Sequence, residues 1–342
     1  MFQLSFNQKV GLGFAFIIVL LVTSGATSLW NLSDINESTS RVNQTAVPVV
    51  KESNNVQIQL LKLAKLSALA FNAESKEQIS EYKRDFDAGI ERFDQLYLSL
   101  EALAESDAEM TTFVIGIKSN YDFYRYAVAE MFDAKIAVLN ARDAMLSEAD
   151  ILLDLADGVG GALVEIQYFA APAEYEEQME LVSGMANQAD TNAMAIMKTI
   201  EEIKITSDQS RLSSGMDDFK FALDDSKRWY DKAAEIFKEF DDQSIIAMAE
   251  TAYADLDAYF SVSPSMVDHK LTELKKIDVA KQKLSEADAA VSQSISGLDE
   301  LLGTADAQFE VLQHEVLGNL DLGFKTSIAM LIILILLAAQ NF

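Results

Sequence analysis

The sequence contains no cysteine and only 3 prolines, 14 glycines and 2 histidines among its 342 residues. Without cysteine, the chain has no disulfides and no thiolate metal sites. His269 and His314 lie far apart along one predicted helix, so the two imidazoles of one chain cannot bind the same metal ion. The few prolines and glycines leave most of the chain free of helix breakers, and 50% of the residues are hydrophobic. This composition predicts long helices with well-filled cores.

Acidic residues are absent from both ends of the chain. Residues 1–31 and 323–342 contain no Asp or Glu and one lysine each, Lys9 and Lys325. The negative charge behind the formal net charge of −27 therefore lies entirely in the middle segment. Such a surface disfavours nucleic acid as a partner, because phosphate binding needs clustered Lys and Arg. Two interpretations of the acidic surface remain open, namely solubility through solvated charge and attraction of cationic ligands.

The acid-free ends predict two membrane spans. Residues 10–30 supply about 20 mostly apolar residues, the length that a bilayer core requires. A cleaved signal peptide is the alternative for this stretch. Within the second span, 323–342, residues 323–339 are apolar on every face apart from one lysine and two small hydroxyl side chains. Lys9 favours residues 1–9 in the cytoplasm and residues 31–322 outside, with a C-terminus that returns to the cytoplasm and the lipid bilayer as a partner.

Apolar residues at alternating spacings of three and four predict helices along the whole middle segment. Pro48 predicts a kink or a restart in the first helix, and Ser75 to Gln78 form a capping box. Gly158, Gly160 and Gly161 predict the first break in the middle of the chain. An acidic stretch then leads through 245–261 to the last helix. The predicted helices cover about 31–72, 75–103, 106–157, 175–203, 207–240 and 265–336. No strand pattern competes with them, so the predicted fold class is all-α.

The helix lengths predict how the helices pack. At about 1.5 Å per residue, the third and last helices are much longer than the others, which form two hairpins. Short connections then favour two stacked four-helix bundles that share the two long helices and are flanked by the N- and C-terminal transmembrane helices. The predicted membrane-proximal bundle consists of about 31–132 and 292–322, and the membrane-distal bundle of about 133–291.

Three short motifs and the span–bundle–span plan resemble a family of bacterial membrane receptors. The motifs are LSFNQKVGLGF at residues 4–14, NLSDIN at residues 31–36 and AVPVV at residues 46–50. Together with the plan, they make the chain similar to methyl-accepting chemotaxis receptors whose periplasmic sensor region is of the helical bimodular type. The resemblance implies a homodimer in the bacterial inner membrane, with residues 31–322 in the periplasm.

The resemblance also implies a mechanism and a set of partners. Such receptors bind a small molecule outside, often an organic acid or another small metabolite, and signal inward by a piston-like or rotational movement of the last helix. They continue after the second span into a HAMP linker and a cytoplasmic signalling region. Here the sequence stops at Phe342, so we expect either a truncated gene or a protein that signals through a partner. The sensor region of a histidine kinase, which can bind a periplasmic binding protein, is the alternative.

No pattern in the sequence predicts an enzyme. There is no GxSxG, no phosphate-binding loop and no dinucleotide-binding fingerprint. The acidic doublets at 217–218, 224–225 and 241–242 lack the loop spacing of a calcium site, so we interpret them as solvated helix faces. We therefore expect neither a metal nor another cofactor.

Basic and aromatic side chains inside a bundle are the better candidates, because ligands of helical bundles bind between helices. Tyr121, Tyr124 and Arg125 lie within about one turn of the third helix. Asn54 and Asn55 on the first helix and Arg92 on the second are expected at a similar level. A guanidinium group at this position can hold a carboxylate, with the tyrosines shaping the cavity. The alternative is that the tyrosines are ordinary core residues and both arginines extend to solvent.

Two hypotheses of function follow. The first is a dimeric extracytoplasmic sensor whose ligand shifts the last helix across the membrane. The second is a structural or accessory membrane protein with a rigid helical stalk and no small-molecule ligand. The sequence identifies neither the ligand nor the bundle that binds it.

Overall fold

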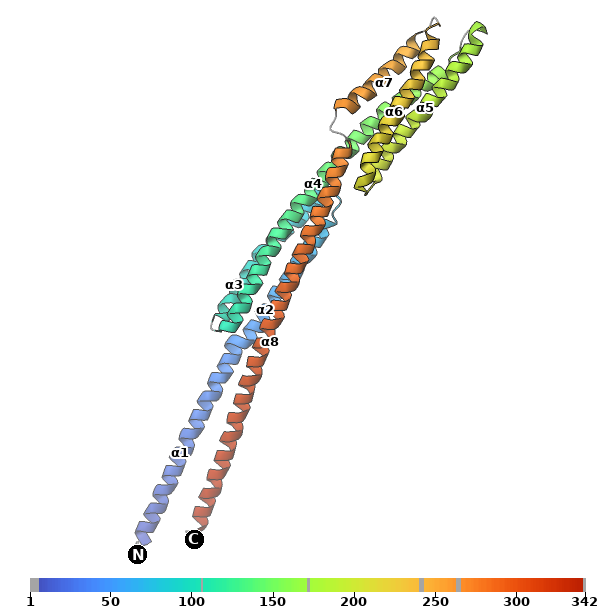
Figure 1. The fold of residues 1–342 in the computed structure, drawn as a ribbon. Helices are drawn as coiled ribbons and strands as arrows, with labels where there is room; N and C mark the ends of the chain where they lie inside the picture. The colour runs from blue at the N-terminus through green and yellow to red at the C-terminus, as the bar shows by residue number, and fades with distance from the viewer. Residues whose placement is uncertain (1–5, 106, 171–172, 240–242, 263–265, 341–342) are drawn as a thin grey trace. The chain divides into compact units, whose positions relative to one another are not determined.

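The computed structural model describes residues 6–340 apart from 106, 171–172, 240–242 and 263–265. Within this part the chain is all-α, as predicted (Figure 1). Residues 1–5 and 341–342, and the predicted helix boundaries at 106, 240 and 265, lie outside the described residues. The helices are α1 Phe6–Arg41, the π-helical turn η1 Val42–Ala46, α2 Val47–Phe71, α3 Lys76–Ala104, α4 Ala108–Gln167, the short 3₁₀ turn η2 Ala173–Tyr175, α5 Glu176–Ile205, α6 Gln209–Phe237, α7 Ser244–Val262 and α8 Met266–Gln340.

The folded chain divides into two compact units. Unit 1 consists of the chain up to Ser67, Arg84–Tyr126 and the chain from Glu286. Unit 2 consists of Ala68–Lys83 and Ala127–Ser285. The two longest helices, α4 with 60 residues and α8 with 75, contribute to both units. The end-to-end stacking of two bundles stays a prediction.

Unit 1 has a core to which α2, α3, α4 and α8 all contribute. Contacts across the helices include the hydrogen bond from Gln59 Nε2 on α2 to the Gly89 carbonyl on α3, at 2.9 Å. Tyr97 Oη on α3 donates to the Val114 carbonyl on α4 at 3.3 Å. The buried apolar residues include Val56, Leu60 and Leu63 of α2, Phe86, Phe93 and Leu100 of α3, Met110, Ile117 and Tyr121 of α4, and Ala287, Leu298 and Ala305 of α8.

The apolar positions predicted along the last helix divide into two groups. Val291, Leu298 and Ala305 are buried, as a helix packed on one side requires. Phe309, the next predicted position, is 39% exposed, and the predicted positions Leu312 and Val316 are only half-buried. The predicted core face of α8 therefore ends near Ala305, and the following turns leave large apolar side chains uncovered within one chain.

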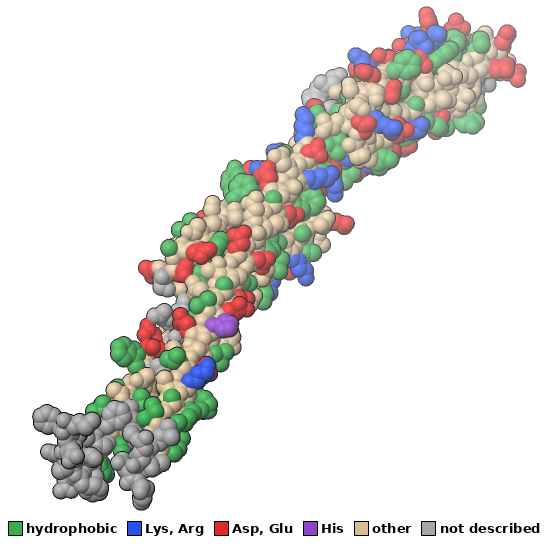
Figure 2. Space-filling model, turned by 60° about the horizontal axis from the view of Figure 1, so that its bottom comes forward, with side chains coloured by type: hydrophobic (Ala, Val, Ile, Leu, Met, Phe, Trp, Pro, Cys, Tyr) green, Lys and Arg blue, Asp and Glu red, His purple; other side chains and the backbone are tan. Residues whose placement is uncertain are grey.

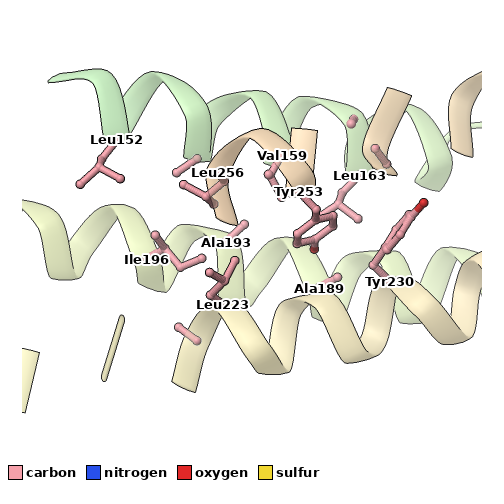
Figure 3. Close-up of a cluster of buried hydrophobic side chains, with 14 of the residues drawn as sticks. Leu152, Val159, Leu163, Ala189, Ala193, Ile196, Leu223, Tyr230, Tyr253 and Leu256 are labelled. Atoms are coloured by element: carbon pink, nitrogen blue, oxygen red, sulfur yellow. The ribbon is translucent and has the colours of Figure 1, made fainter. Parts of the chain in front are cut away.

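Unit 2 has its own core, made by α4, α5, α6 and α7 with the first turns of α8. Figure 1 shows α5 and α6 side by side as an antiparallel hairpin. Figure 3 shows how side chains from all four helices meet in this core, among them Leu152 and Val159 of α4, Ala193 and Ile196 of α5, Leu223 and Tyr230 of α6, and Tyr253 and Leu256 of α7. Residues 245–261 thus belong to a helix of the core rather than to a linker, because Ile246, Ala249, Tyr253 and Leu256 repeat at helical spacing.

The start of α3 follows the predicted capping box, whereas the end of α4 does not follow the predicted break. Ser75 Oγ accepts the Gln78 N–H at 3.2 Å, and Asp107 caps α4 by accepting the Glu109 and Met110 N–H groups. The expectation that α4 ends near residue 157 is wrong, because it continues to Gln167. Gly158, Gly160 and Gly161 adopt helical geometry inside it, since glycine weakens a helix without preventing one.

Two of the described helical stretches could cross a membrane by length and composition. They lie within Ile17–Glu37, with a mean hydropathy of 1.2, and within Met266–Ile333, with a mean hydropathy of 1.5, and in both cases the apolar window is 0% buried. The apolar tract of the second stretch is at its C-terminal end. Figure 2 shows acidic side chains spread over the face in view, whereas hydrophobic side chains gather toward the free ends of α1 and α8.

Candidate ligand-binding site

Tyr121 and Tyr124 lie in an aromatic cluster between α3 and α4 of unit 1. The Tyr121 ring stacks on Phe93 with centroids 3.7 Å apart and planes at 19°. The Tyr124 ring contacts Phe86 at 5.9 Å between centroids. Both tyrosines are fully buried, because positions three apart on α4 face the same side of the helix. The cluster combines a large apolar surface with two hydroxyl groups.

The two hydroxyl groups differ in their partners. Tyr124 Oη donates to Ser67 Oγ on α2 at 3.5 Å. Tyr121 Oη is buried and has no hydrogen-bond partner among the described residues. Burial raises the pKa of both phenols well above the ordinary value, so each keeps its proton and can donate a hydrogen bond. A buried donor without a partner is costly, so the Tyr121 hydroxyl marks the place in this cluster where a ligand or a water molecule would gain a hydrogen bond.

Arg125 lies beside this cluster but already has an anionic neighbour. Its Nη1 lies 3.8 Å from Asp94 Oδ2, and its guanidinium carbon lies 5.7 Å from the centroid of the Tyr121 ring. Both members of the ion pair are about 40% exposed, with side-chain values of 42% and 41%. A carboxylate ligand at Arg125 would have to compete with Asp94 for the guanidinium group.

Of the other three predicted residues, two have local partners and one is exposed to solvent. Asn54 is exposed, and Asn55 Nδ2 donates to Glu52 Oε2 within α2 at 3.3 Å. Arg92 is exposed and contacts Gln95 Oε1 at 3.5 Å. Among the described residues, hydrogen bonds and ion pairs do not connect these three side chains to Tyr121, Tyr124 or Arg125. The structure thus groups three of the six predicted residues, and a ligand site made by all six stays a prediction.

A buried ion network in unit 2 was not anticipated from the sequence. Glu273 on α8 has a side chain only 3% exposed, and its carboxylate accepts hydrogen bonds from Arg142 Nε at 2.9 Å and Lys270 Nζ at 3.0 Å. Lys270 Nζ also donates to the carbonyl of Lys204 at 2.9 Å. On the neighbouring turn, His269 Nε2 lies 3.2 Å from Glu148 Oε1. The network connects α8 to α4 and to the C-terminal end of α5.

The described residues contain no cluster of His, Asp and Glu arranged to hold a metal ion. What they contain is a set of long helices with polar groups placed between them. Such an arrangement can bind small molecules or partner proteins and can move one helix against another.

Comparison with protein families agrees with this description. Residues 3–182, more than half of the chain, match the family described as a four helix bundle sensory module for signal transduction. The chain belongs to this family. No curated protein sequence is significantly similar to this sensory module.

Two solved structures have a similar fold. One is the TorS sensor domain in complex with TorT in the presence of TMAO, with 12% identity and a TM-score of 0.56. The other is the sensor domain of the histidine kinase TorS from V. parahaemolyticus, with 13% identity and a TM-score of 0.56. Each comparison covers 75% of this chain and 99% of the solved chain. At these identities the likeness shows a shared fold, and it extends beyond the residues that the family match covers.

Proposed function

We propose that this sensory module is the periplasmic sensor region of a two-span receptor in the bacterial inner membrane, which binds a small molecule between its helices and signals by displacement of α8. The observation that supports the proposal is the continuity of α8. This helix runs unbroken from Met266 to Gln340, contributes core residues to both units and ends in the apolar tract. A helix is stiff along its axis because each turn is hydrogen-bonded to the next.

Displacement of α8 requires a ligand with unequal affinity for two positions of the helix. A ligand shifts a two-state equilibrium only by the difference between its binding free energies to the two states. The contact of α8 with α4 in unit 1 is close, because a Cβ added at Gly297 would lie 3.1 Å from Ile117 Cγ1. A small displacement of α4 at Ile117 therefore requires α8 to shift at Gly297.

For the ligand site we propose the aromatic cluster at Tyr121, together with Tyr124 and Arg125. The unpartnered Tyr121 hydroxyl supports this choice, since a ligand that accepts a hydrogen bond there would remove the cost of a buried free donor. Asn54, Asn55 and Arg92 would have to turn toward the cluster to take part. An organic acid is the ligand class that Arg125 favours, in competition with Asp94.

Two output classes remain candidates for the full signalling system. The sequence motifs favour a chemotaxis receptor, and the fold shared with TorS favours the sensor of a histidine kinase. By analogy with the complex of TorS with TorT, a partner protein that delivers the ligand is the alternative to direct binding. A homodimer is expected in either class, because Phe309, Leu317 and Leu320 of α8 are exposed in one chain.

The absence of cysteine allows a direct test by disulfide crosslinking in the intact chain. Ligands are first identified by a thermal-shift screen of the detergent-solubilised chain with organic acids, amino acids and polyamines, because a bound ligand raises the melting temperature. The pair Ile117→Cys and Gly297→Cys then reports on α4 against α8. The pair Gln59→Cys and Gly89→Cys reports on α2 against α3 and is the control.

We expect a ligand from the screen to change the crosslinking rate of the 117–297 pair and to leave the 59–89 pair unchanged. Tyr121→Phe should weaken the thermal shift, because it removes the unpartnered hydroxyl and keeps the stacked ring. A ligand that stabilises the chain without any change at the 117–297 pair would contradict signalling through α8. A screen without any hit would favour the structural stalk.

A further inference from the structure

A second place in unit 1 has the shape and charge of a ligand site. The first turns of α4 and the segment of α8 from Glu300 to Glu315 enclose a groove of about 950 Å³, and Ala46 lies at its edge. This volume is within the range of pockets that hold small molecules, roughly 300–1,000 Å³. The groove is separate from the aromatic cluster at Tyr121, because none of the aromatic residues of that cluster lines it.

The groove has an apolar floor. Phe113 on α4 and Ala307, Val311 and Leu312 on α8 present apolar side chains to it. Val311 is 59% exposed, although it lies just beyond the buried face of α8. At Gly303 a Cβ would meet no atom within 4 Å, so this position of the groove is open space. An alkyl chain placed here would bury its own apolar surface and that of the groove floor.

The rim of the groove is acidic. Glu109, Glu300 and Glu315 line it, and no lysine or arginine does. Within the described part of the chain, these three carboxylates form no ion pair or side-chain hydrogen bond. The fourth carboxylate, that of Asp107, is already used, since Oδ1 caps α4 and Oδ2 accepts a hydrogen bond from Gln308 Nε2 at 2.6 Å. Three unpaired carboxylates around an apolar floor attract a group that is cationic at one end and apolar at the other.

We propose that this groove binds an amphipathic organic cation, with its alkyl chain on the floor and its ammonium group among Glu109, Glu300 and Glu315. The proposal goes beyond the sensor function and does not depend on it, because binding in the groove requires no movement of α8. A free alkylamine and the ethanolamine headgroup of a lipid share this ammonium chemistry. Glu315 and Glu300 lie 8 and 23 residues before the apolar tract that begins at Gly323, about 12 and 35 Å along α8. A free amine reaches the groove from solution, whereas a lipid reaches it only by rising out of the bilayer.

The test uses the intact chain in a neutral maltoside detergent and isothermal titration calorimetry. Hexylamine, hexanoate and hexanol have the same alkyl chain and differ in the charge of the head group. We expect saturable binding of hexylamine, with the alcohol and the acid bound at least about tenfold more weakly. Equal binding of hexylamine and hexanol would overturn the proposal, as would the absence of saturable binding at millimolar hexylamine.

Two double variants test which carboxylates bind the ammonium group. Glu300→Gln with Glu315→Gln should weaken hexylamine binding about tenfold, because two partly exposed ion pairs are lost. Glu91→Gln with Glu130→Gln removes the same charge from exposed glutamates that do not line the groove, and it should leave the affinity unchanged. Equal losses in the two double variants would assign the binding to the general negative charge of the surface and overturn the site.

A further pair of variants tests whether the alkyl chain lies in the groove. Gly303→Leu places a side chain in the groove, where a Cβ meets no atom within 4 Å, and should weaken hexylamine binding. Gly116→Leu is its control, since a Cβ there also meets no atom within 4 Å and the residue does not line the groove. Leucine is a better helix former than glycine, so neither variant should unfold the chain. Unchanged binding in Gly303→Leu would overturn the proposal.

Binding measured in nanodiscs of two lipid compositions distinguishes the two possible sources of the ammonium group, a free amine and a lipid. If hexylamine binds equally in phosphatidylglycerol discs and in discs that also contain phosphatidylethanolamine, the groove takes a free amine. If the phosphatidylethanolamine discs abolish hexylamine binding and Gly303→Leu removes this competition, the occupant is the lipid headgroup. Both results support the groove as an ammonium site, and the detergent titrations decide whether the site exists.

Discussion

At the scale of single residues, the buried carboxylate of Glu273 in unit 2 depends on two cationic partners. It is buried between the cationic groups of Arg142 and Lys270. Removing one partner of a buried ion pair leaves a charge without compensation in a medium of low polarity, whereas exposed pairs contribute little. The network therefore holds the start of α8 to α4 only as long as all its members are present.

We predict that Glu273→Gln lowers the free energy of unfolding by about 3 kcal/mol. Glu202→Gln, which removes the exposed ion pair with Lys198, should change it by less than about 1 kcal/mol. Urea unfolding of both variants, followed by circular dichroism, measures the difference. Similar values for the two variants would show that Glu273 is solvated in the folded chain.

Asp107 gives a prediction of pH dependence. The hydrogen bond from the backbone N–H of Met110 is the main cause that lowers the pKa of its carboxyl below the ordinary value of 3.8. Burial opposes this effect, and hydrogen bonds from Gln308 and from the N–H of Glu109 add to it. A carboxyl with a lowered pKa stabilises the fold above its unfolded pKa, and this stability is lost as the pH falls through the folded pKa. Its contribution should thus be constant above about pH 5 and decrease progressively as the pH falls below the unfolded pKa of about 3.9 toward the lowered folded pKa.

We predict that Asp107→Ala costs about 1 kcal/mol of stability at pH 7, the usual loss for a helix N-cap, and less at pH 3. Urea unfolding midpoints of the wild type and the variant between pH 3 and pH 7 measure this. Asp87→Ala, at an exposed position of α3, is the control and should show no comparable loss at pH 7. A loss that stays the same down to pH 3 would assign it to packing rather than to the charged cap.

At the scale of secondary-structure elements, α4 shows what glycine does inside a long helix. Gly158 and Gly161 are exposed, and a Cβ at either position would meet no atom within 4 Å. Gly89 of α3 lies against α2, and its Cβ would be 2.7 Å from Leu63 Cδ2 and 3.2 Å from Gln59 Nε2. The first two glycines therefore cost helix stability without a packing reason, and the third permits a close approach of two helices.

We predict that Gly158→Ala and Gly161→Ala each stabilise unit 2 by about 0.5–1 kcal/mol. Gly89→Ala should destabilise the chain, because Leu63 and Gln59 must move. Thermal unfolding of the three single variants compares the signs directly. A loss of stability in Gly158→Ala or Gly161→Ala would indicate that a contact absent from one chain covers that face of α4.

The same elements show how far sequence reasoning reaches. Heptad spacing predicted the fold class, the buried positions of Tyr121 and Tyr124, and the core face of α8 as far as Ala305, because periodicity directly reports which helix face is apolar. It placed a break at the glycines of α4, where packing on one face is strong enough to keep the helix intact. It also overlooked the regular spacing of Ile246, Ala249, Tyr253 and Leu256 in α7.

Pairings between helices could not be predicted in the same way. Arg142 and Glu273 are 131 positions apart in the sequence, and no local pattern relates them. The partner of Arg125 is Asp94 on another helix, and the groove beside Glu300 depends on which residues α4 presents to α8. Such features depend on how each helix is rotated about its axis and on its height relative to its neighbours. The spacing of apolar residues shows which face of a helix is buried but not which residue of the neighbouring helix it contacts.

At the scale of the whole molecule, the distribution of charge leads to a prediction of topology. Lys9 and the amino terminus, which precede the first apolar stretch, predict that residues 31–322 lie outside the cytoplasm. In a cysteine-free chain, Asp218→Cys and Lys9→Cys are single labels on the two predicted sides. We expect a membrane-impermeant maleimide to label Asp218→Cys in intact bacterial cells, and Lys9→Cys only after the cells are permeabilised. Labelling of Lys9→Cys in intact cells would reverse the orientation.

The π-helical turn Val42–Ala46 has a consequence for the first span. A π turn accommodates one residue more than an α turn, so the helix before it is out of phase with the helix after it. One residue corresponds to about 100° around an α-helix. Deleting a single residue here would restore an uninterrupted α-helix and rotate α1 by that angle about its axis relative to α2. In the proposed receptor, this short turn therefore sets which side of the first span each apolar residue occupies.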